Sequence, residues 1–326
     1  MIPTPGESPS LFPVRVTAAE PVARDIVRFE LRATDDRALP AFTAGAHIPV
    51  RTPAGVMRQY SLCGSESDNG RYLIAVKREA AGRGGSASMV DTLKPGDTIE
   101  IAAPVNQFPL DDRARSFLLI AGGIGITPML AMALALAEEG TRRFRLIYLT
   151  RDRESAAFTD TLSSPELKAS VTLHHDGGDP DRAFDLWPLL EKPGSVNGQH
   201  VYCCGPAGLM EAVRDMTGHW PASAVHFESF GVDTAARADD RAFVVACRSS
   251  GLEFEVPVGR TILEVAREQG IDIPSSCESG TCGSCKTGLL SGEADHRDLV
   301  LLPEERERHI MVCVSRARSQ RLEIDR

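Results

Sequence analysis

Four cysteines near the end of the chain constrain its fold more than any other feature. Three of them form the pattern C-x4-C-x2-C, as Cys277, Cys282 and Cys285, and Cys313 follows further along. Three thiolates on one tight loop can hold one side of a small iron–sulfur cluster while a fourth completes it, and this spacing is typical of [2Fe–2S] sites. The sequence therefore predicts a [2Fe–2S] cluster bound by these four residues.

Other uses of these cysteines fit the spacing less well. A structural zinc site usually pairs two short C-x2–4-C knuckles, and the sequence has only one. A redox C-x-x-C pair would leave Cys277 and Cys313 without a role. A Rieske cluster needs two histidine ligands in place of two cysteines. A zinc-stabilised dehydrogenase stays open as an alternative, and it predicts a colourless carboxyl-terminal domain.

Composition limits the classes of partner. The 326 residues include 36 Lys and Arg against 45 Asp and Glu, a net charge of −9, so we expect no nucleic acid partner. No apolar run approaches the length of a membrane span, and we expect no membrane partner. The first ten residues lack the basic and apolar regions of a secretory signal. We expect a cytoplasmic protein and a monomer.

The pattern of apolar residues divides the chain into three domains. Short alternating strands up to residue 112 predict an antiparallel β-barrel of six strands. From Phe117 on, continuous apolar strands alternate with helices, which predicts a parallel α/β domain over residues 113–230. A polar linker spans residues 231–241. Residues 242–326 predict an α+β domain with a strand hairpin, a helix that starts at a Thr261–Glu264 capping box, and strands at 311–317 and 321–325.

A glycine turn in the second domain predicts nucleotide binding. Residues 118–130 read LLIAGGIGITPML, a strand that leads through Gly123 and Gly125 into a helix. We expect Thr127 to cap this helix, Pro128 to occupy its first position, and a pyrophosphate to bind at its amino end. The G-x-G-x-x-G pattern fails at Pro128. Arg151 and Asp152 follow the next strand, and this spacing alone leaves the choice between NADPH and NADH open.

Several longer motifs resemble one known family. The sequences RQYSL (58–62) and CCGP (203–206) resemble the ferredoxin–NADP reductase superfamily. The sequences GRGGS (82–86), HFESFG (226–231), PSSCESGTCGSCKT (274–287) and SGEADHRD (291–298) closely resemble the phthalate dioxygenase reductase family, in the same order over essentially the whole chain. The resemblance implies an FMN-binding β-barrel, an NADH-binding α/β domain and a plant-type ferredoxin (β-grasp) domain on one polypeptide.

The resemblance also implies roles for individual residues. Ser61 would lie near flavin N5 and Cys204 beside nicotinamide C4, as the two catalytic residues. Asp152 would bind the ribose, which favours NADH. The GRGGS loop would close the phosphate end, which favours FMN over FAD. The implied FMN residues are Arg58, Tyr60, Ser61, Ala75, Val76, Lys77, Arg83, Gly84, Gly85, Ser86, Thr127 and Phe230. The implied NAD residues are Gly123, Gly125, Asp152, Cys204, Gly205 and Pro206.

The implied activity is electron transfer. Electrons would pass from NADH to FMN, then to the [2Fe–2S] cluster, and then to a Rieske-type terminal oxygenase on a separate chain, with phthalate dioxygenase as the expected partner. One alternative keeps this chemistry and serves another oxygenase, such as a vanillate-type demethylase. Another alternative is a non-enzymatic iron–sulfur redox sensor, which predicts no rapid oxidation of NADH.

Overall fold

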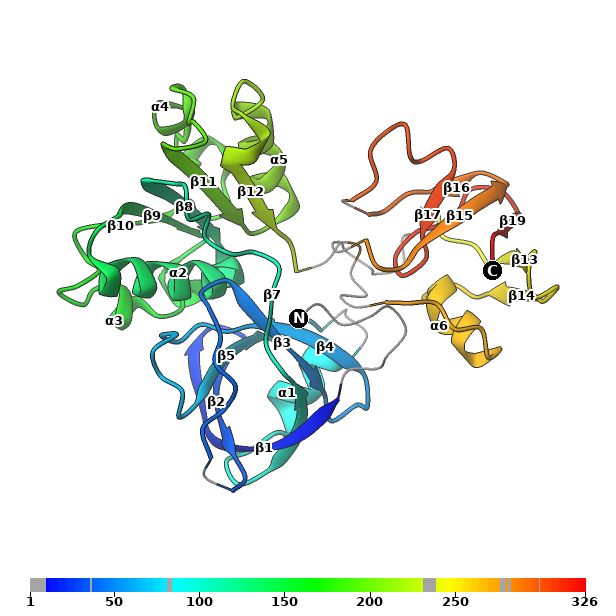
Figure 1. The fold of residues 1–326 in the computed structure, drawn as a ribbon, viewed down its shortest axis with the longest axis horizontal. Helices are drawn as coiled ribbons and strands as arrows, with labels where there is room; N and C mark the ends of the chain where they lie inside the picture. Colours follow the sequence, from blue (N-terminus) through cyan, green and yellow to red (C-terminus); the bar gives the residue numbers. More distant parts are fainter. Residues whose placement is uncertain are drawn as a thin grey trace. The chain divides into compact units, whose positions relative to one another are not determined.

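The chain forms two compact units, one ending at Ser229 and the other beginning at Phe230. The computed structural model describes residues 10–35, 37–80, 84–230, 239–275, 280, 283–298 and 300–326. The first unit runs from blue to yellow-green in Figure 1 and contains a barrel and a parallel sheet, and the second runs from yellow to red. The expected multidomain class, an antiparallel barrel, a parallel α/β sheet and an α+β domain, is confirmed.

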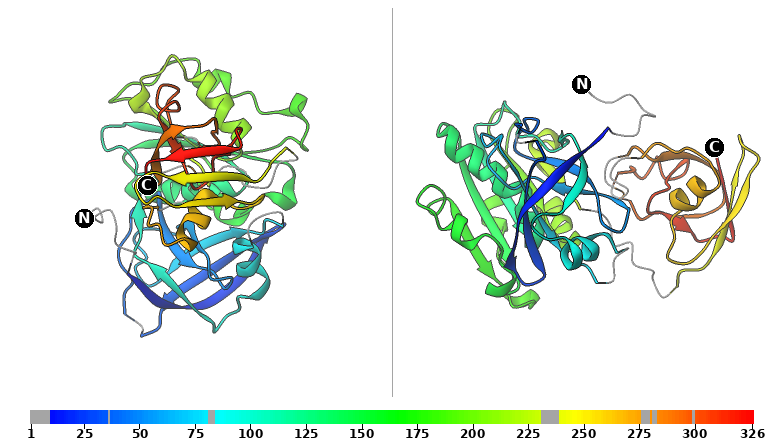
Figure 2. Two further views of the ribbon diagram at one scale, coloured as in Figure 1. Left: turned by 90° about the vertical axis from the view of Figure 1, so that its right-hand side faces the viewer. Right: turned by 90° about the horizontal axis from the view of Figure 1, so that it is seen from below.

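The barrel is a seven-stranded antiparallel sheet in the order β4-β3-β6-β1-β2-β5, with β7 paired to β3. The prediction of six strands missed only β7, which is two residues long. A bridge between Leu62 and Ile74 joins the region after β4 to β5 and closes the barrel. The long strand β1, dark blue in Figure 2, has two register shifts against β2, and such bulges let a strand bend around a barrel. The strands are β1 (Leu11–Ala23), β2 (Ile26–Ala33), β3 (Ala46–Arg51), β4 (Met57–Ser61), β5 (Tyr72–Lys77), β6 (Thr98–Ala102) and β7 (Val105–Asn106), and helix α1 (Gly85–Thr92) lies between β5 and β6.

The second half of the first unit is a five-stranded parallel sheet in the order β10-β9-β8-β11-β12. Its strands are β8 (Ser116–Gly122), β9 (Arg143–Thr150), β10 (Val171–His175), β11 (Gln199–Cys204) and β12 (Val225–Glu228). Its helices are α2 (Ile126–Glu139), α3 (Thr159–Leu162), α4 (Trp187–Leu190) and α5 (Ala207–Met216).

Alternate residues of β8 reach the two faces of the parallel sheet. Phe117 and Leu119 pack with α2 and with barrel residues such as Phe108, whereas Leu118 and Ile120 pack with residues of α4 and α5. In Figure 1, α2 and α3 lie on one side of the sheet, and α4 and α5 lie on the other. Because α2 is buried between the sheet and the barrel, the two halves of this unit share one core.

The start of α2 differs from the prediction. The helix begins at Ile126 rather than after a Thr127 cap, because a 3-10 turn over Gly123–Gly125 continues directly into it. The buried Thr127 hydroxyl instead donates a hydrogen bond to the Ile124 carbonyl, at 3.1 Å. The prediction was therefore wrong about the cap and about Pro128, which is the third residue of α2 rather than the first. It was right about the order of strand, glycine turn and helix.

The second unit has a mixed five-stranded sheet in the order β14-β13-β19-β15-β17 and a separate pair β16–β18. The predicted hairpin and the Thr261–Glu264 capping box are both present. The strand expected at 311–317 is wrong, because β17 ends at Met311 and the next residues turn, with the Ser315 amide donating to the Met311 carbonyl. The elements are β13 (Phe243–Cys247), β14 (Glu253–Val256), α6 (Ile262–Glu268), β15 (Lys286–Ser291), β16 (Ala294–Asp295), β17 (His309–Met311), β18 (Arg316–Ala317) and β19 (Arg321–Ile324).

Among the residues that the structure describes, no helix is both long and apolar enough to cross a bilayer.

Candidate functional site

The carboxyl ends of three neighbouring strands bring the predicted nicotinamide residues together. In the register of the parallel sheet, Cys204 of β11 pairs with Ala121 of β8 on one side and with Glu228 of β12 on the other. Ligands of open parallel α/β sheets bind at this edge, where the loops after the strands converge. The turn of Gly123 and the loop of Gly205 therefore flank Cys204.

A hydrogen bond joins this edge to the barrel. Ser61, at the end of β4 and 4% exposed, donates to the Glu228 carboxyl with 3.4 Å between Oγ and Oε2. Burial raises the pKa of Glu228 to about 8, and the hydrogen bond from Ser61 lowers it only in part. Near neutral pH the Glu228 side chain is therefore mostly a neutral acid that can itself donate a proton or a hydrogen bond.

Cys204 is fully buried beside this carboxyl. Burial raises the pKa of its thiol well above the usual value, and the neighbouring Glu228 and Cys203 raise it further. The thiol therefore stays protonated at neutral pH. Because a thiolate is the reactive form of cysteine, Cys204 is suited to shaping the pocket rather than to acting as a nucleophile.

The three glycines of the turn, Gly122, Gly123 and Gly125, have different structural roles. A Cβ on Gly125 would lie 2.2 Å from the Cys204 carbonyl oxygen, so this glycine allows two backbones to touch. Gly122 is similar, because a Cβ there would lie 2.6 Å from Pro206 Cδ. Gly123 has φ of +52° and open space around it. Of these three, Gly123 leaves room for a pyrophosphate at the start of the helix.

Asp152 lies directly after β9, as predicted, with its carboxylate already engaged. It accepts a hydrogen bond from the Ser155 amide at 2.8 Å and pairs with Arg24 of the β1–β2 turn at 3.1 Å. Hydrogen bonds from Ser155, and then from Arg24, keep the pKa of Asp152 below its ordinary value. The carboxylate is therefore charged and held in one orientation. Nothing in the sequence pointed to Arg24, which lies far from Asp152 along the chain.

Some of the predicted flavin residues lie on β4 and at the start of α1. Tyr60 has a buried hydroxyl without a hydrogen-bond partner, and burial raises its pKa to about 12. Arg58, two residues before it, lies against the amino end of α1, since a Cβ on Gly85 would be 3.1 Å from Arg58 Nε. Gly84 has φ of +81° and open space on its Cβ side. An unpartnered phenol, a guanidinium and an open helix start fit a planar heterocycle with a phosphate.

The remaining flavin candidates are positioned by β5 and α1. Ala75 and Val76 are buried, while Lys77 is exposed and pairs with Glu79 at 2.7 Å. The Ser86 hydroxyl accepts from the Glu79 amide at 3.1 Å, which fixes the start of α1 to the end of β5. Arg83 lies outside the described residues. Phe230, 43% exposed, belongs to the second unit.

Two of the four predicted cluster ligands lie at one end of an antiparallel pair. Lys286 of β15 pairs with Met311 of β17, so Cys285, just before β15, and Cys313, just after β17, reach the same end of the pair. Both side chains are buried. Gly280, with φ of +77°, packs so closely that a Cβ would lie 2.8 Å from Val314 Cγ2. Cys277 and Cys282 lie outside the described residues. Two buried thiols that converge in this way fit a metal cluster.

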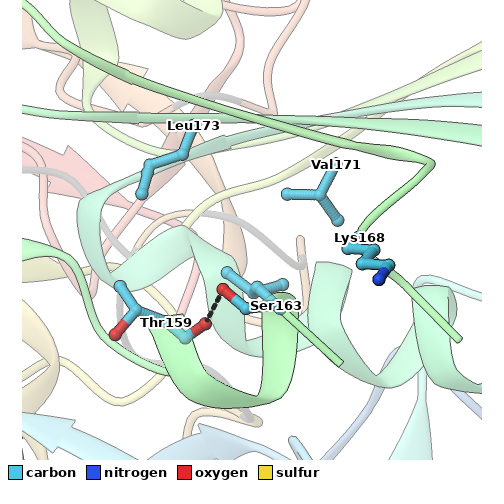
Figure 3. A pocket seen from close by; sticks show the side chains of 6 residues that line it. Thr159, Ser163, Lys168, Val171 and Leu173 are labelled. Atoms are coloured by element: carbon cyan, nitrogen blue, oxygen red, sulfur yellow. Dashed lines mark hydrogen bonds between the residues drawn. The ribbon is translucent and has the colours of Figure 1, made fainter. Parts of the chain in front are cut away.

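One hollow lies away from these sites. Figure 3 shows a cavity of about 240 Å³ between α3 and the edge strand β10, with Thr159, Ser163, Lys168, Val171 and Leu173 around it. It contains none of the predicted site residues.

Comparison with known proteins identifies the family. Three family models match in order: an oxidoreductase FAD-binding domain over residues 13–109, an oxidoreductase NAD-binding domain over 119–215, and a 2Fe-2S iron-sulfur cluster binding domain over 245–318. Phthalate dioxygenase reductase of Burkholderia cepacia is 55% identical over 312 residues, which cover 96% of each chain. The chain belongs to the phthalate dioxygenase reductase family.

A second relative and a solved structure agree with this assignment. The reductase subunit of phthalate 4,5-dioxygenase from Pseudomonas putida is 51% identical, again over 96% of each chain. A solved phthalate dioxygenase reductase, titled a modular structure for electron transfer from pyridine nucleotides to [2Fe-2S], superposes with a TM-score of 0.87 at 54% identity. It covers 97% of this chain and 98% of that one. The predicted flavin, pyridine nucleotide and [2Fe–2S] cluster, and the oxidoreductase class, are confirmed.

Sequence reasoning missed Glu228 as a functional residue. The motif HFESFG contains it, but only as part of a resemblance. The signal available was a carboxylate in a short apolar strand, because a buried acid needs a polar partner. That the partner would be Ser61, on another sheet, could not be predicted from the spacing.

Proposed function

We propose that this chain is the NADH-dependent reductase of a two-component aromatic-ring oxygenase, and that its partner is a Rieske-type oxygenase of the phthalate dioxygenase class. Bound FMN would supply the chemistry that links a two-electron hydride donor, NADH, to a one-electron acceptor, the [2Fe–2S] cluster. The proposal depends chiefly on one observation. Ser61 of the barrel contacts Glu228 at the edge that also holds Cys204, so one chain can bring a flavin and a nicotinamide together.

In this proposal the chain's own residues position the flavin and the nicotinamide. Arg58 and Arg83 would neutralise the FMN phosphate together with the amides of residues 84–86. Tyr60, residues 75–77 and Thr127 would bound the flavin ring. Ser61 and Cys204 would flank the two reacting atoms, flavin N5 and nicotinamide C4, and would exclude water from between them. Glu228, held by Ser61, would keep a proton near the flavin.

The proposed nucleotide site uses the carboxyl edge of the parallel sheet. Gly123 would admit the pyrophosphate, and Gly125 would hold the turn against the backbone of Cys204. Gly205 and Pro206 would shape the nicotinamide loop, and Asp152 would accept the ribose hydroxyls. A fixed carboxylate at that position repels a 2′-phosphate, which supports NADH over NADPH. Cys277, Cys282, Cys285 and Cys313 would hold the cluster.

The proposal extends to the organisation and location of the protein. The domains would span residues 1–112, 113–230 and 242–326, with residues 231–241 as the linker. We propose a monomer in the cytoplasm, the reducing compartment in which cluster thiols persist.

An anaerobic visible spectrum of the purified holoprotein tests the proposal first. Flavin bands with broad iron–sulfur absorption at longer wavelengths, bleached rapidly by NADH and slowly by NADPH, are the expected result. A pure flavin spectrum would remove the cluster and the oxygenase partner, and equal bleaching by both nucleotides would remove the choice of NADH. Reduction of purified phthalate-type and vanillate-type oxygenases, compared at equal concentration, then decides the partner.

A further inference from the structure

Two histidines and one aspartate meet near the amino ends of the parallel strands. The nucleotide site lies at the other, carboxyl ends of these strands. His200 and His226 are the second residues of β11 and β12, and Asp111 lies in the segment between β7 and β8. One carboxylate oxygen of Asp111 and one ring nitrogen of each histidine all lie within 4.8 Å of one another. At about 3.3 Å of rise per residue, His200 lies on the order of 13 Å along β11 from Cys204.

The two imidazoles present suitable nitrogens to each other. His200 Nδ1 and His226 Nε2 are 3.0 Å apart, close to the separation of about 3.3 Å between two ligands of a tetrahedral zinc ion with bonds of about 2.05 Å. The other nitrogen of His200, Nε2, lies 3.0 Å from the Val196 carbonyl oxygen. Because a carbonyl only accepts, Nε2 carries the proton and Nδ1 has its lone pair directed at His226. Histidine ligands of metals are typically oriented by this kind of carbonyl contact.

A tyrosine holds the second histidine and the aspartate in place. The ring of Tyr202 stacks on the ring of His226, with centroids 4.2 Å apart. The Tyr202 hydroxyl accepts from the Asp111 amide at 2.8 Å and donates to the Pro109 carbonyl at 3.0 Å. One buried side chain therefore fixes both groups relative to each other before any ligand binds, which lowers the cost of ordering a site.

The charge states of His226 and Asp111 suit a cation. Burial, and then the neighbouring His200, lower the pKa of His226 to about 4, so its ring is neutral and has a lone pair to offer. Hydrogen bonds from Arg113 hold the pKa of Asp111 well below its usual range, so its carboxylate is charged. Nitrogen and oxygen ligands must be deprotonated to bind a metal. At neutral pH the His226 ring is neutral and the Asp111 carboxylate is charged, so both groups meet this requirement.

A cavity of about 360 Å³ borders the cluster and is lined by Phe108, Pro109, Asp111, Val225 and His226, among others. It has room for the water molecules that complete the coordination of an ion held by three protein ligands.

We propose that Asp111, His200 and His226 form a binding site for a divalent transition-metal ion of the Zn²⁺ type, separate from the cofactor sites. Two imidazoles and one carboxylate suit such an ion. An ion on His226 Nε2 requires the tautomer protonated at Nδ1, so Nε2 releases its proton to solvent while Nδ1 takes one up, and the neutral ring loses no net proton. The ion would tie the segment that connects the barrel to the parallel sheet to the edge formed by β11 and β12.

Arg113 competes with the ion for Asp111. Its backbone amide and Nε lie 2.9 Å and 3.0 Å from Oδ1, and its Nη2 lies 2.6 Å from Oδ2. This arginine is exposed, so it can swing away when a cation arrives. Removal of its guanidinium is therefore expected to strengthen metal binding.

Zinc binding to the full holoprotein tests the proposal, with Zn²⁺ alone as the probe. After dialysis against a chelator, with flavin and iron contents checked, equilibrium dialysis should show one saturable zinc per chain. X-ray absorption at the zinc edge should show nitrogen and oxygen neighbours, since the proposed ligands are two imidazoles and a carboxylate. Zinc held by the chain's cysteines would show sulfur neighbours instead.

Matched variants locate the site. His226→Phe keeps a ring stacked on Tyr202 and removes the ligand nitrogen, and Asp111→Asn keeps an oxygen for Arg113 and removes the charge. Each should weaken zinc binding by about tenfold or more. Arg113→Gln should strengthen it, and His174→Gln, at a histidine that bonds the Arg182 carbonyl, should leave it unchanged.

Flavin content and circular dichroism show whether each variant folds, and the two ligand variants serve as independent tests. Sulfur neighbours, the absence of saturable binding, or equal affinity in His226→Phe, Asp111→Asn and the parent protein would overturn the site. These readouts do not depend on the electron-transfer function, so the two proposals fail separately.

Discussion

Ser61 and Glu228 belong to different sheets, and their side chains form a hydrogen bond of 3.4 Å at the point where the barrel meets the edge of the parallel sheet. The bond places a carboxyl whose pKa is raised to about 8 beside the buried thiol of Cys204. The chemistry proposed for this chain therefore depends on a contact that neither half of the unit could form alone.

The first prediction concerns pH and stability. Glu228 has a pKa of about 8 in the folded protein against an ordinary value of 4.5, so between these values the folded state holds a proton that the unfolded state releases. Its contribution is fully present below about pH 4.5 and is lost as pH rises through about 8. Each pKa unit is worth about 1.4 kcal/mol, so a few kcal/mol are at stake.

Thermal unfolding of the holoprotein and of Glu228→Gln at several pH values measures this effect. The melting temperature of the parent protein should fall relative to the variant between pH 5 and pH 8.5. Parallel melting curves across this range would mean that desolvation does not raise the pKa of this carboxyl. Glu228→Gln should also lose the alkaline limb of the pH profile for NADH-driven ferricyanide reduction.

The second prediction separates cluster ligands from other buried thiols. Cys313→Ser should remove the long-wavelength absorption and the reduction of the oxygenase, and should keep NADH-driven ferricyanide reduction, since that reaction needs only the flavin. Cys247→Ser is the matched control, because Cys247 is buried in the same core and lies outside the predicted ligand set. A normal cluster spectrum in Cys313→Ser would refute the assignment of this ligand.

The third prediction concerns a close approach of two backbones. Gly125→Ala would place a Cβ 2.2 Å from the Cys204 carbonyl oxygen, so the turn or β11 must move. We expect a loss of roughly 2 kcal/mol in stability, as for overpacked cores, and a higher KM for NADH. Gly208→Ala, in α5 with open space around it, should be neutral or stabilising by up to about 1 kcal/mol. Equal melting temperatures for both variants would contradict this account.

The fourth prediction concerns the choice of nucleotide. Asp152→Asn keeps an acceptor for the Ser155 amide and removes the charge, so NADH binding should weaken and discrimination against NADPH should fall by about tenfold. Glu154→Gln is the control, because Glu154 also pairs with Arg24 but is not predicted to touch the ribose. Values of kcat/KM for both nucleotides measure the effect, and an unchanged ratio in Asp152→Asn would exclude its role.

Features that depend on residues close together in the sequence were predicted correctly. The strand, glycine turn and helix around Gly123, the Thr261–Glu264 capping box and the hairpin of β13 and β14 are all present, because each is set by residues close together in sequence. The prediction of where α2 starts was wrong, because a 3-10 turn can take the place of a side-chain cap. No residue type indicates which of the two occurs.

What the sequence could not supply was contact between distant segments. Gly125 was expected to face a pyrophosphate, and the structure shows that its missing side chain makes room for the backbone of Cys204. Arg24 pairs with Asp152, and Ser61 with Glu228, through tertiary structure alone. These pairs decide the electrostatics of the site, and spacing along a chain carries no information about them.

The Tyr202 hydroxyl, bonded to both Pro109 and Asp111, has a consequence for recombination between related reductases. The end of the barrel near residue 112 looks like a natural junction for chimaeras, yet a crossover there would pair a connecting segment from one parent with a tyrosine and two histidines from the other. Flavin and nucleotide halves should therefore be inherited together, with junctions placed after β12 instead.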